Sequence, residues 1–132
     1  MKLTQNFNKI EFDSKDGAEM PPIIIIQIKE LAEDLQVIRD YINKPIHINS
    51  AYRSITHNKD IGGVRNSYHT KGMAADITVK GYTPRKLARV ILKLMKEEKI
   101  TKGGIGLYNG FVHYDIRGRY AFWNKSSWYN IW

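Results

Sequence analysis

The sequence contains no cysteine, and this absence excludes several kinds of protein at once. Without thiols the chain forms no disulfide bond and offers no thiolate ligand, so a zinc finger and a cysteine nucleophile are both excluded. The absence does not indicate a compartment, because a cysteine-free protein survives in either redox environment. A metal site in this chain would have to be built without sulfur.

Long apolar runs are also absent. The longest uninterrupted one covers residues 23–26, whereas a membrane-spanning helix needs roughly 20 apolar residues. The opening segment, MKLTQNFNKIEF, lacks the apolar stretch of a signal peptide. We therefore expect no membrane insertion, and we expect a protein made in the cytoplasm that acts elsewhere only after release or export.

Acidic residues are scarce relative to basic ones, with 13 Asp and Glu against 21 Lys and Arg and a net charge of +8. This excess favours an anionic partner, such as nucleic acid, an acidic membrane surface or an acidic cell-wall polymer, but a solvated basic surface explains it equally well. No block of consecutive basic residues is present, which weighs against nucleic acid. A nucleic-acid-binding domain is thus an alternative supported by charge alone, and we expect no nucleic-acid partner.

The length of 132 residues suits one domain, and 42% apolar with 26% charged residues is a globular composition. No repeat or linker divides the chain, so we expect a single domain over residues 1–132 and a monomer. Two segments have helical periodicity, one opening at Pro21-Pro22 and one at Thr83-Pro84, where threonine serves as N-cap. Their apolar stripes are Ile24, Ile28, Leu31, Leu35, Ile38 and Ile42 in the first, and Leu87, Val90, Ile91, Leu94 and Met95 in the second.

The remaining segments predict short strands and turns. Strand patterns cover residues 45–50, 74–79, 105–108 and 111–116, and the last two flank Asn109-Gly110, a strong two-residue hairpin turn. Residues 1–20 read as an irregular lead-in, residues 54–60 as one or two helical turns, and the aromatic tail from residue 121 as a segment that packs back on the domain. The predicted fold class is α+β, a small antiparallel sheet with helices packed on one side.

A histidine and an aspartate lie close together in the segment SYHTKGMAAD. Asp76 follows His69 by seven positions, and Gly72 between them permits a tight turn. Imidazole and carboxylate are both zinc ligands, and a catalytic zinc usually takes three protein ligands plus water. Taken singly, His69 would be a surface loop residue and Asp76 a turn or capping residue.

The strand FVHYDIR supplies the third ligand. Alternate side chains of a strand share a face, so the apolar residues at 112, 114 and 116 face the core. His113, Asp115 and Arg117 then look together into a cleft. The combination of His69, Asp76 and His113 predicts a metal site, although His113 alone would be a satisfied core histidine.

Three segments carry a resemblance to a known family: SAYR, GGVRNSYHTKGMAAD and GGIGLYNGFVHYDIRG. They resemble the zinc D-alanyl-D-alanine carboxypeptidase family of peptidoglycan peptidases, in its branch of murein endopeptidases and phage endolysins. The specific part of the resemblance covers about residues 44–120. It implies the zinc fold shared with the Hedgehog signalling domain, and one Zn²⁺ bound by His69, Asp76 and His113.

The resemblance also implies roles around the zinc. Arg53 would reach into the cleft to hold a substrate carboxylate or an oxyanion, with a structural ion pair as the alternative. Ser67 would bind substrate or merely fix its loop. Tyr108, on the preceding strand, is a weaker candidate for stabilising the oxyanion.

One position departs from the family pattern. Several branches place an acidic general base three residues before the last histidine ligand, where this chain has Gly110. We nominate Asp115 as the base or as the group that orients the zinc water. The competing interpretation makes it a partner of a ligand histidine or an ion pair with Arg117.

We interpret the other histidines, His47 and His57, as structural. The tryptophans at 123, 128 and 132 could stack on sugar rings, but core packing is the preferred interpretation. The resemblance implies a zinc metallopeptidase acting on peptidoglycan, as a D-Ala-D-Ala carboxypeptidase, an endopeptidase or a prophage endolysin. The alternative is a catalytically weak or inactive zinc-containing module of the same fold that binds the cell wall.

Overall fold

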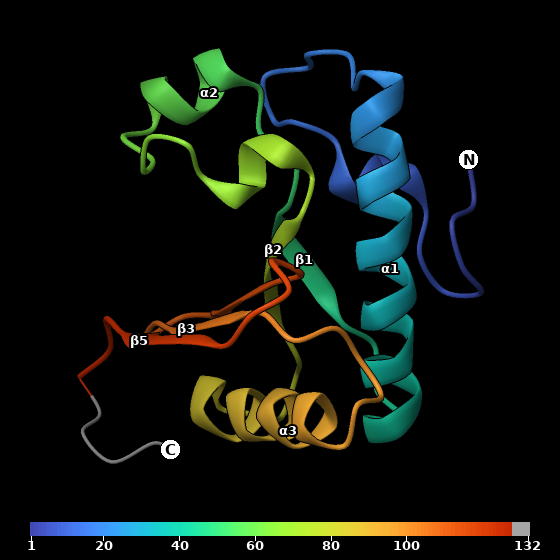
Figure 1. Cartoon of the computed structure of the whole chain (residues 1–132), viewed down its shortest axis with the longest axis vertical. Coiled ribbons are helices and arrows are strands. Elements are labelled where there is room, and N and C mark those ends of the chain that lie inside the picture. Colours follow the sequence, from blue (N-terminus) through green and yellow to red (C-terminus); the bar gives the residue numbers. More distant parts are fainter. Residues whose placement is uncertain (128–132) are drawn as a thin grey trace.

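A computed structural model describes residues 1–127. Every expected helix and strand is present in its expected place, and two short 3₁₀ helices and one further strand are added (Figure 1). The elements are the short 3₁₀ helices η1 (Lys9–Phe12) and η2 (Tyr68–Lys71), the helices α1 (Pro22–Ile42), α2 (Ile55–Asp60) and α3 (Pro84–Lys96), and the strands β1 (His47–Ser50), β2 (Ala74–Thr78), β3 (Gly104–Leu107), β4 (Val112–Asp115) and β5 (Ala121–Asn124).

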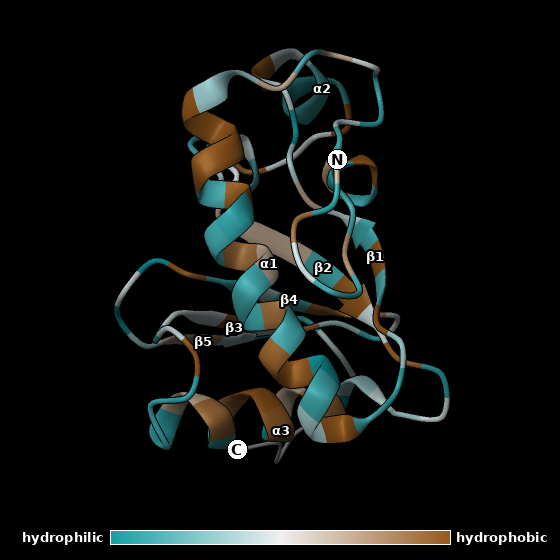
Figure 2. Ribbon diagram, turned by 90° about the vertical axis from the view of Figure 1, so that its right-hand side faces the viewer, coloured by the Kyte–Doolittle hydropathy of each residue, from teal (hydrophilic) through white to brown (hydrophobic). Residues whose placement is uncertain are grey.

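The two long helices form where the apolar periodicity predicts them. α1 starts with proline in its first turn and ends at Asn43, which adopts the left-handed conformation. In α3 the Thr83 hydroxyl accepts a hydrogen bond from the Lys86 amide at 3.1 Å, as an N-cap should. Apolar and polar residues alternate along both helices in Figure 2. Their apolar stripes, apart from the partly buried Ile24 and Val90, are buried in one core with residues of β1 to β4.

The sheet has the strand order β1-β2-β4-β3-β5. The first four strands pair antiparallel as expected, and Tyr108 and Phe111 close the predicted turn between β3 and β4. β5 was not predicted as a strand, and it pairs parallel to β3 at the sheet edge, so the sheet is mixed. The α+β class is confirmed, but helices were expected on one side of the sheet and the short helices η2 and α2 lie on the side opposite α3. The tail up to Ser127 packs back on the domain through the pairing of β5.

One face of the sheet packs on the core, and the other carries the polar residues. α3 lies below the sheet in Figure 1 and packs against β3 and β4, while η2 and α2 lie above it. Ile77, Val112 and Tyr114 point into the core, and Tyr114 is anchored there because its hydroxyl donates to the Thr101 carbonyl at 2.7 Å. The alternate positions, including Asp76 and His113, therefore face the upper side.

The lead-in is irregular apart from η1, yet it contributes to the core. Phe7, Phe12 and Met20 are buried, with 1%, 0% and 3% of their surfaces exposed. Aromatic and apolar burial thus fixes a segment that has no helical or strand periodicity. Within residues 1–127, no helix combines the length and the apolar character needed to cross a membrane.

Candidate metal centre

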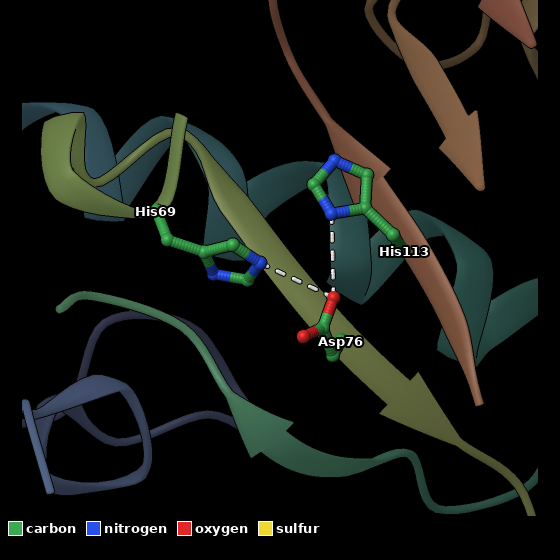
Figure 3. A group of neighbouring side chains, drawn as sticks. All are labelled: His69, Asp76 and His113. Carbon is green, nitrogen blue, oxygen red and sulfur yellow. Dashed lines mark hydrogen bonds and ion pairs between the residues drawn. The ribbon is translucent and has the colours of Figure 1, made fainter. Parts of the chain in front are cut away.

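Three separate elements bring His69, Asp76 and His113 together. His69 comes from η2, Asp76 from β2 and His113 from β4, and the last two are paired directly across the sheet. One potential ligand atom from each residue lies within 4.8 Å of the other two. Figure 3 shows both imidazoles pointing at the carboxylate, whose Oδ1 is 3.2 Å from His69 Nε2 and 3.3 Å from His113 Nδ1.

Backbone contacts fix the His69 ring. Its Nδ1 lies 2.7 Å from the carbonyl oxygen of Ala51, an atom that can only accept a hydrogen bond. Nδ1 must therefore carry the proton, which leaves the Nε2 lone pair of the neutral ring free. The loop itself is held by Ser67, whose hydroxyl accepts a hydrogen bond from the His69 amide at 3.1 Å.

The Asp76 carboxylate uses its two oxygens differently. Oδ2 accepts a hydrogen bond from Arg53 Nη2 at 3.2 Å, whereas Oδ1 faces the two imidazoles. Burial alone would raise the pKa of Asp76, but its hydrogen bonds with His113 and His69 outweigh burial and hold the pKa well below its usual value. Asp76 is therefore ionised in the folded protein.

His113 has a partner of its own, Asp115. His113 Nε2 donates to Asp115 Oδ2 at 2.7 Å, so Nδ1 is the nitrogen left facing Asp76. Burial alone would lower the pKa of His113, yet the bonds with Asp115 and Asp76 raise it above its usual value. The cluster consequently favours positive charge at this point.

The donor set fits a divalent metal. His69 Nε2, His113 Nδ1 and Asp76 Oδ1 converge on one point. A proton holds them together there as hydrogen bonds, and a divalent cation that displaced it would be attracted by the ionised carboxylate and by both imidazole lone pairs. The second polar atom of each residue is already engaged, by the Ala51 carbonyl, Asp115 and Arg53 respectively. Two imidazole nitrogens and one carboxylate oxygen, each oriented from behind, are a typical ligand set for a catalytic zinc.

The cluster opens into a pocket of about 510 Å³. Apart from Asp76, the charged residues lining it are basic: Arg53, Arg117 and Lys125. Four aromatic residues complete the wall, namely Tyr68, Tyr108, Phe111 and Trp123. The pocket is thus suited to an anionic substrate with apolar surface.

The residues nominated for binding substrate lie in this pocket, but they are not all free to do so. Arg53, Ser67 and Tyr108 each line it. All three guanidinium nitrogens of Arg53 are hydrogen-bonded within the protein, to Ser50, Asn58 and Asp76. The ion pair that was the alternative for Arg53 is therefore present, and its first task is to hold Asp76.

Asp115 does not lie where a general base is needed. It is fully buried and is not among the residues that line the pocket. Oδ1 accepts from the Gly104 amide at 2.9 Å and from Arg117 Nε at 2.8 Å, and Oδ2 accepts from His113 and from Arg117 Nη2. Burial alone would raise the pKa of this carboxyl, but its bonds with Arg117, His113 and the Gly104 amide together outweigh burial, so the pKa ends below its usual value. The geometry contradicts the nomination as base and agrees with the alternative, a partner of His113 paired with Arg117.

The tryptophan interpretation needs a correction at Trp123. This residue is only half buried, and its indole lines the pocket with its ring centroid 5.0 Å from that of His113. It lies on β5, the strand that the sequence pattern missed, so its face could not be predicted. Trp128 and Trp132 lie outside the described residues. His47 and His57 are not among the residues lining the pocket.

Sequence reasoning missed Asn58, which is 5% exposed although it is polar. Its Oδ1 accepts from Arg53 Nη1 at 3.2 Å and its Nδ2 donates to the Val64 carbonyl at 2.9 Å. Asn58 thereby links the loop beside the pocket to the arginine that holds Asp76. Glycine at position 63 leaves room for this side chain, because a Cβ there would collide with Asn58.

Comparison with known proteins agrees with this geometry. Residues 2–115 match the family model described as Peptidase M15. Over 79 residues the chain is 34% identical to peptidoglycan L,D-endopeptidase MepK of Escherichia coli K12, covering 54% of this chain and 40% of that protein. It is 46% identical over 44 residues to the zinc D-Ala-D-Ala carboxypeptidase of Streptomyces albus G, covering 33% of this chain and 17% of that one.

The matched segments span two fifths or less of these relatives' lengths, so the relatives support a family rather than a particular activity. The family model, in contrast, covers most of the chain and includes all three residues of the candidate metal centre. The chain belongs to the peptidase M15 family.

Proposed function

We propose that this protein is a zinc metallopeptidase that hydrolyses peptide bonds in the stem peptides or cross-links of bacterial peptidoglycan. The observation that carries the proposal is the convergence of His69 Nε2, Asp76 Oδ1 and His113 Nδ1 at the floor of a basic pocket. The two relatives, a peptidoglycan L,D-endopeptidase and a zinc D-Ala-D-Ala carboxypeptidase, support the same substrate class.

One zinc ion would be held by these three residues. In such a site zinc supplies a Lewis acid that activates water near neutral pH and polarises the carbonyl of the scissile bond. Arg53 and Asp115 keep the ligands in place, because each binds the polar atom of a ligand that faces away from the cluster.

The pocket walls would recognise the substrate. Peptidoglycan stems carry free carboxylates, which suit the positive charges of Arg117 and Lys125. Tyr108 presents a hydroxyl to the same pocket and is placed to donate a hydrogen bond to a substrate carbonyl. We further propose that the protein acts as a monomer and reaches the wall after release or export.

Digestion of purified peptidoglycan tests the proposal. We expect the protein with zinc to release soluble fragments, and a chelator to stop the release until zinc is restored. Mass analysis of the fragments identifies the bond, since a carboxypeptidase frees single D-alanine residues and an endopeptidase separates cross-linked stems. Intact peptidoglycan after incubation with the zinc-loaded protein would refute the enzymatic function.

A specific observation favours a second candidate, a zinc-containing module of the same fold that binds the wall without cutting it. Gly110 stands where several branches of the family carry an acidic base, and Asp76 is the one carboxylate among the residues that line the pocket. The two candidates separate in the same assay, because the module would sediment with peptidoglycan and leave its composition unchanged.

A further inference from the structure

The side chain of Trp123 fills a space on the sheet that a glycine on the neighbouring strand leaves open. In the parallel pairing of β3 and β5, Trp123 lies opposite Gly106. A Cβ at Gly106 would collide with the indole at Nε1, Cε2 and Cζ2. The indole therefore packs directly against the backbone of β3, which only glycine at position 106 permits.

The indole joins two residues of the pocket. Its Nε1 donates a hydrogen bond to the Tyr108 hydroxyl at 3.0 Å. Its ring centroid lies 5.0 Å from that of His113 and 5.4 Å from the Arg117 guanidinium. A single side chain on the edge strand thus spans the distance between a candidate metal ligand and the Tyr108 hydroxyl.

The direction of that hydrogen bond decides what Tyr108 can do. An indole N–H can only donate, so the tyrosine oxygen accepts, and its own O–H proton is left for another partner. Within residues 1–127 that proton has no protein acceptor, while Tyr108 lines the pocket. The ring cannot easily turn away, because it stacks on Phe111 with centroids 4.5 Å apart and planes 13° from parallel.

We propose that Trp123 is a positioning residue that directs the Tyr108 O–H into the pocket, toward the carbonyl oxygen of the scissile peptide. This proposal rests on the proposed peptidase function. The donor strengthens its bond as negative charge develops on that oxygen, so its effect falls on kcat more than on KM. Trp123 acts through Tyr108 and takes no part in the chemistry itself.

Kinetics of three variants test the coupling: Trp123→Phe, Tyr108→Phe and the double variant. We expect Tyr108→Phe to lower kcat about 100-fold and Trp123→Phe about tenfold, with zinc affinity unchanged in both. The double variant should be no slower than Tyr108→Phe alone, since Trp123 has no effect once the hydroxyl is gone. Losses that multiply, or a Trp123→Phe enzyme with wild-type kcat, would overturn the proposal. Phe122→Leu is the matched control, because Phe122 is an exposed neighbour on β5 and should retain full activity.

An NMR measurement tests the hydrogen bond independently of any peptidase activity. The indole N–H resonance of Trp123, assigned by its loss in Trp123→Phe, should move upfield and exchange faster with water in Tyr108→Phe. A resonance that is indifferent to Tyr108→Phe would refute the hydrogen bond whatever the activity. Conversely, a wild-type protein that shows this coupling but leaves peptidoglycan intact would refute the peptidase function and, with it, the catalytic use of the tyrosine.

Discussion

The pocket has two walls, and different patterns of hydrogen bonds hold them. The sheet wall comes from β2, β4, β5 and the turn between β3 and β4, and it supplies Asp76 and His113. The loop wall consists of residues 53–72, and it supplies His69. The backbone ladder holds the sheet wall, because Asp76 and His113 are direct partners in the β2–β4 pairing. The loop wall has no ladder: it is held by turn and helix hydrogen bonds of its own backbone, and by single side chains that cap and link those turns.

This difference predicts how each wall responds to a single substitution. A ladder distributes its stability over many hydrogen bonds, so a changed side chain leaves the strand in place. In the loop wall, one capping hydroxyl of Ser67 and one amide of Asn58 hold the backbone beside the pocket. Each such bond contributes about 1 kcal/mol to stability. Variants of Asp76 and His113 should therefore change chemistry with little change in folding, whereas variants of Ser67 and Asn58 should mainly change stability.

The largest effect is expected at the ligand on the sheet wall. His113→Ala should abolish zinc binding and hydrolysis, because two remaining ligands hold the metal weakly. Metal analysis of the purified variant and peptidoglycan digestion measure both losses. The matched control is His47→Ala, since His47 is an exposed strand histidine outside the pocket. Retention of zinc by His113→Ala would remove that residue from the ligand set.

The next largest effect is expected at Asp115, and it tests whether this residue positions His113 or acts as a general base. Asp115→Asn should lower zinc affinity about 10- to 100-fold, because the amide no longer holds the His113 ring as an anionic acceptor does. A competition titration with a chelating dye measures the affinity. At saturating zinc kcat should return close to the wild-type value. A kcat that stays low at full occupancy, with normal zinc affinity, would instead restore Asp115 as a general base.

A smaller effect is expected when the loop wall is loosened at Asn58. Asn58→Ala leaves the Val64 carbonyl and Arg53 Nη1 without their partner, which should lower the free energy of unfolding by about 1–3 kcal/mol. Urea denaturation measures this change. Lys59→Ala, on the exposed side of the same helix, should unfold like the wild type. An Asn58→Ala protein with wild-type stability would show that the loop wall is held by other contacts.

The same contrast explains what the sequence could predict. Strand alternation correctly placed His113 and Asp115 on one face, because the period of two is a local property of the backbone. Helical periodicity likewise located α1 and α3. The segment SYHTKGMAAD identified His69 and Asp76, since its order of histidine, glycine turn and aspartate resembles a motif of the zinc carboxypeptidase family.

Most of the missed features depend on long-range pairing, whereas Asn58 bonds to Arg53 and Val64, five and six positions away. β5 lies at a sheet edge and pairs parallel to β3, so neither its alternation nor a hairpin turn marks it, and Trp123 could not be assigned to the pocket. The partner of Arg53, Asp76, is 23 positions away in the sequence, and nothing local selects it. Asp115 illustrates the same limit, because its face was predicted but its burial beneath Arg117 was not.

The smallest expected effect separates the two interpretations of Ser67. Ser67→Ala removes the cap of η2 and should lower the free energy of unfolding by about 1 kcal/mol, with kcat and KM within about twofold of the wild type. The matched control is Thr83→Ala, because Thr83 caps α3 through a hydrogen bond of the same length, 3.1 Å, and is not among the residues that line the pocket. Equal stability losses with unchanged KM in both variants mean that the serine serves only its loop. A rise in KM confined to Ser67→Ala means that the hydroxyl also contacts the substrate, and the loop wall then shares in recognition as well as in support.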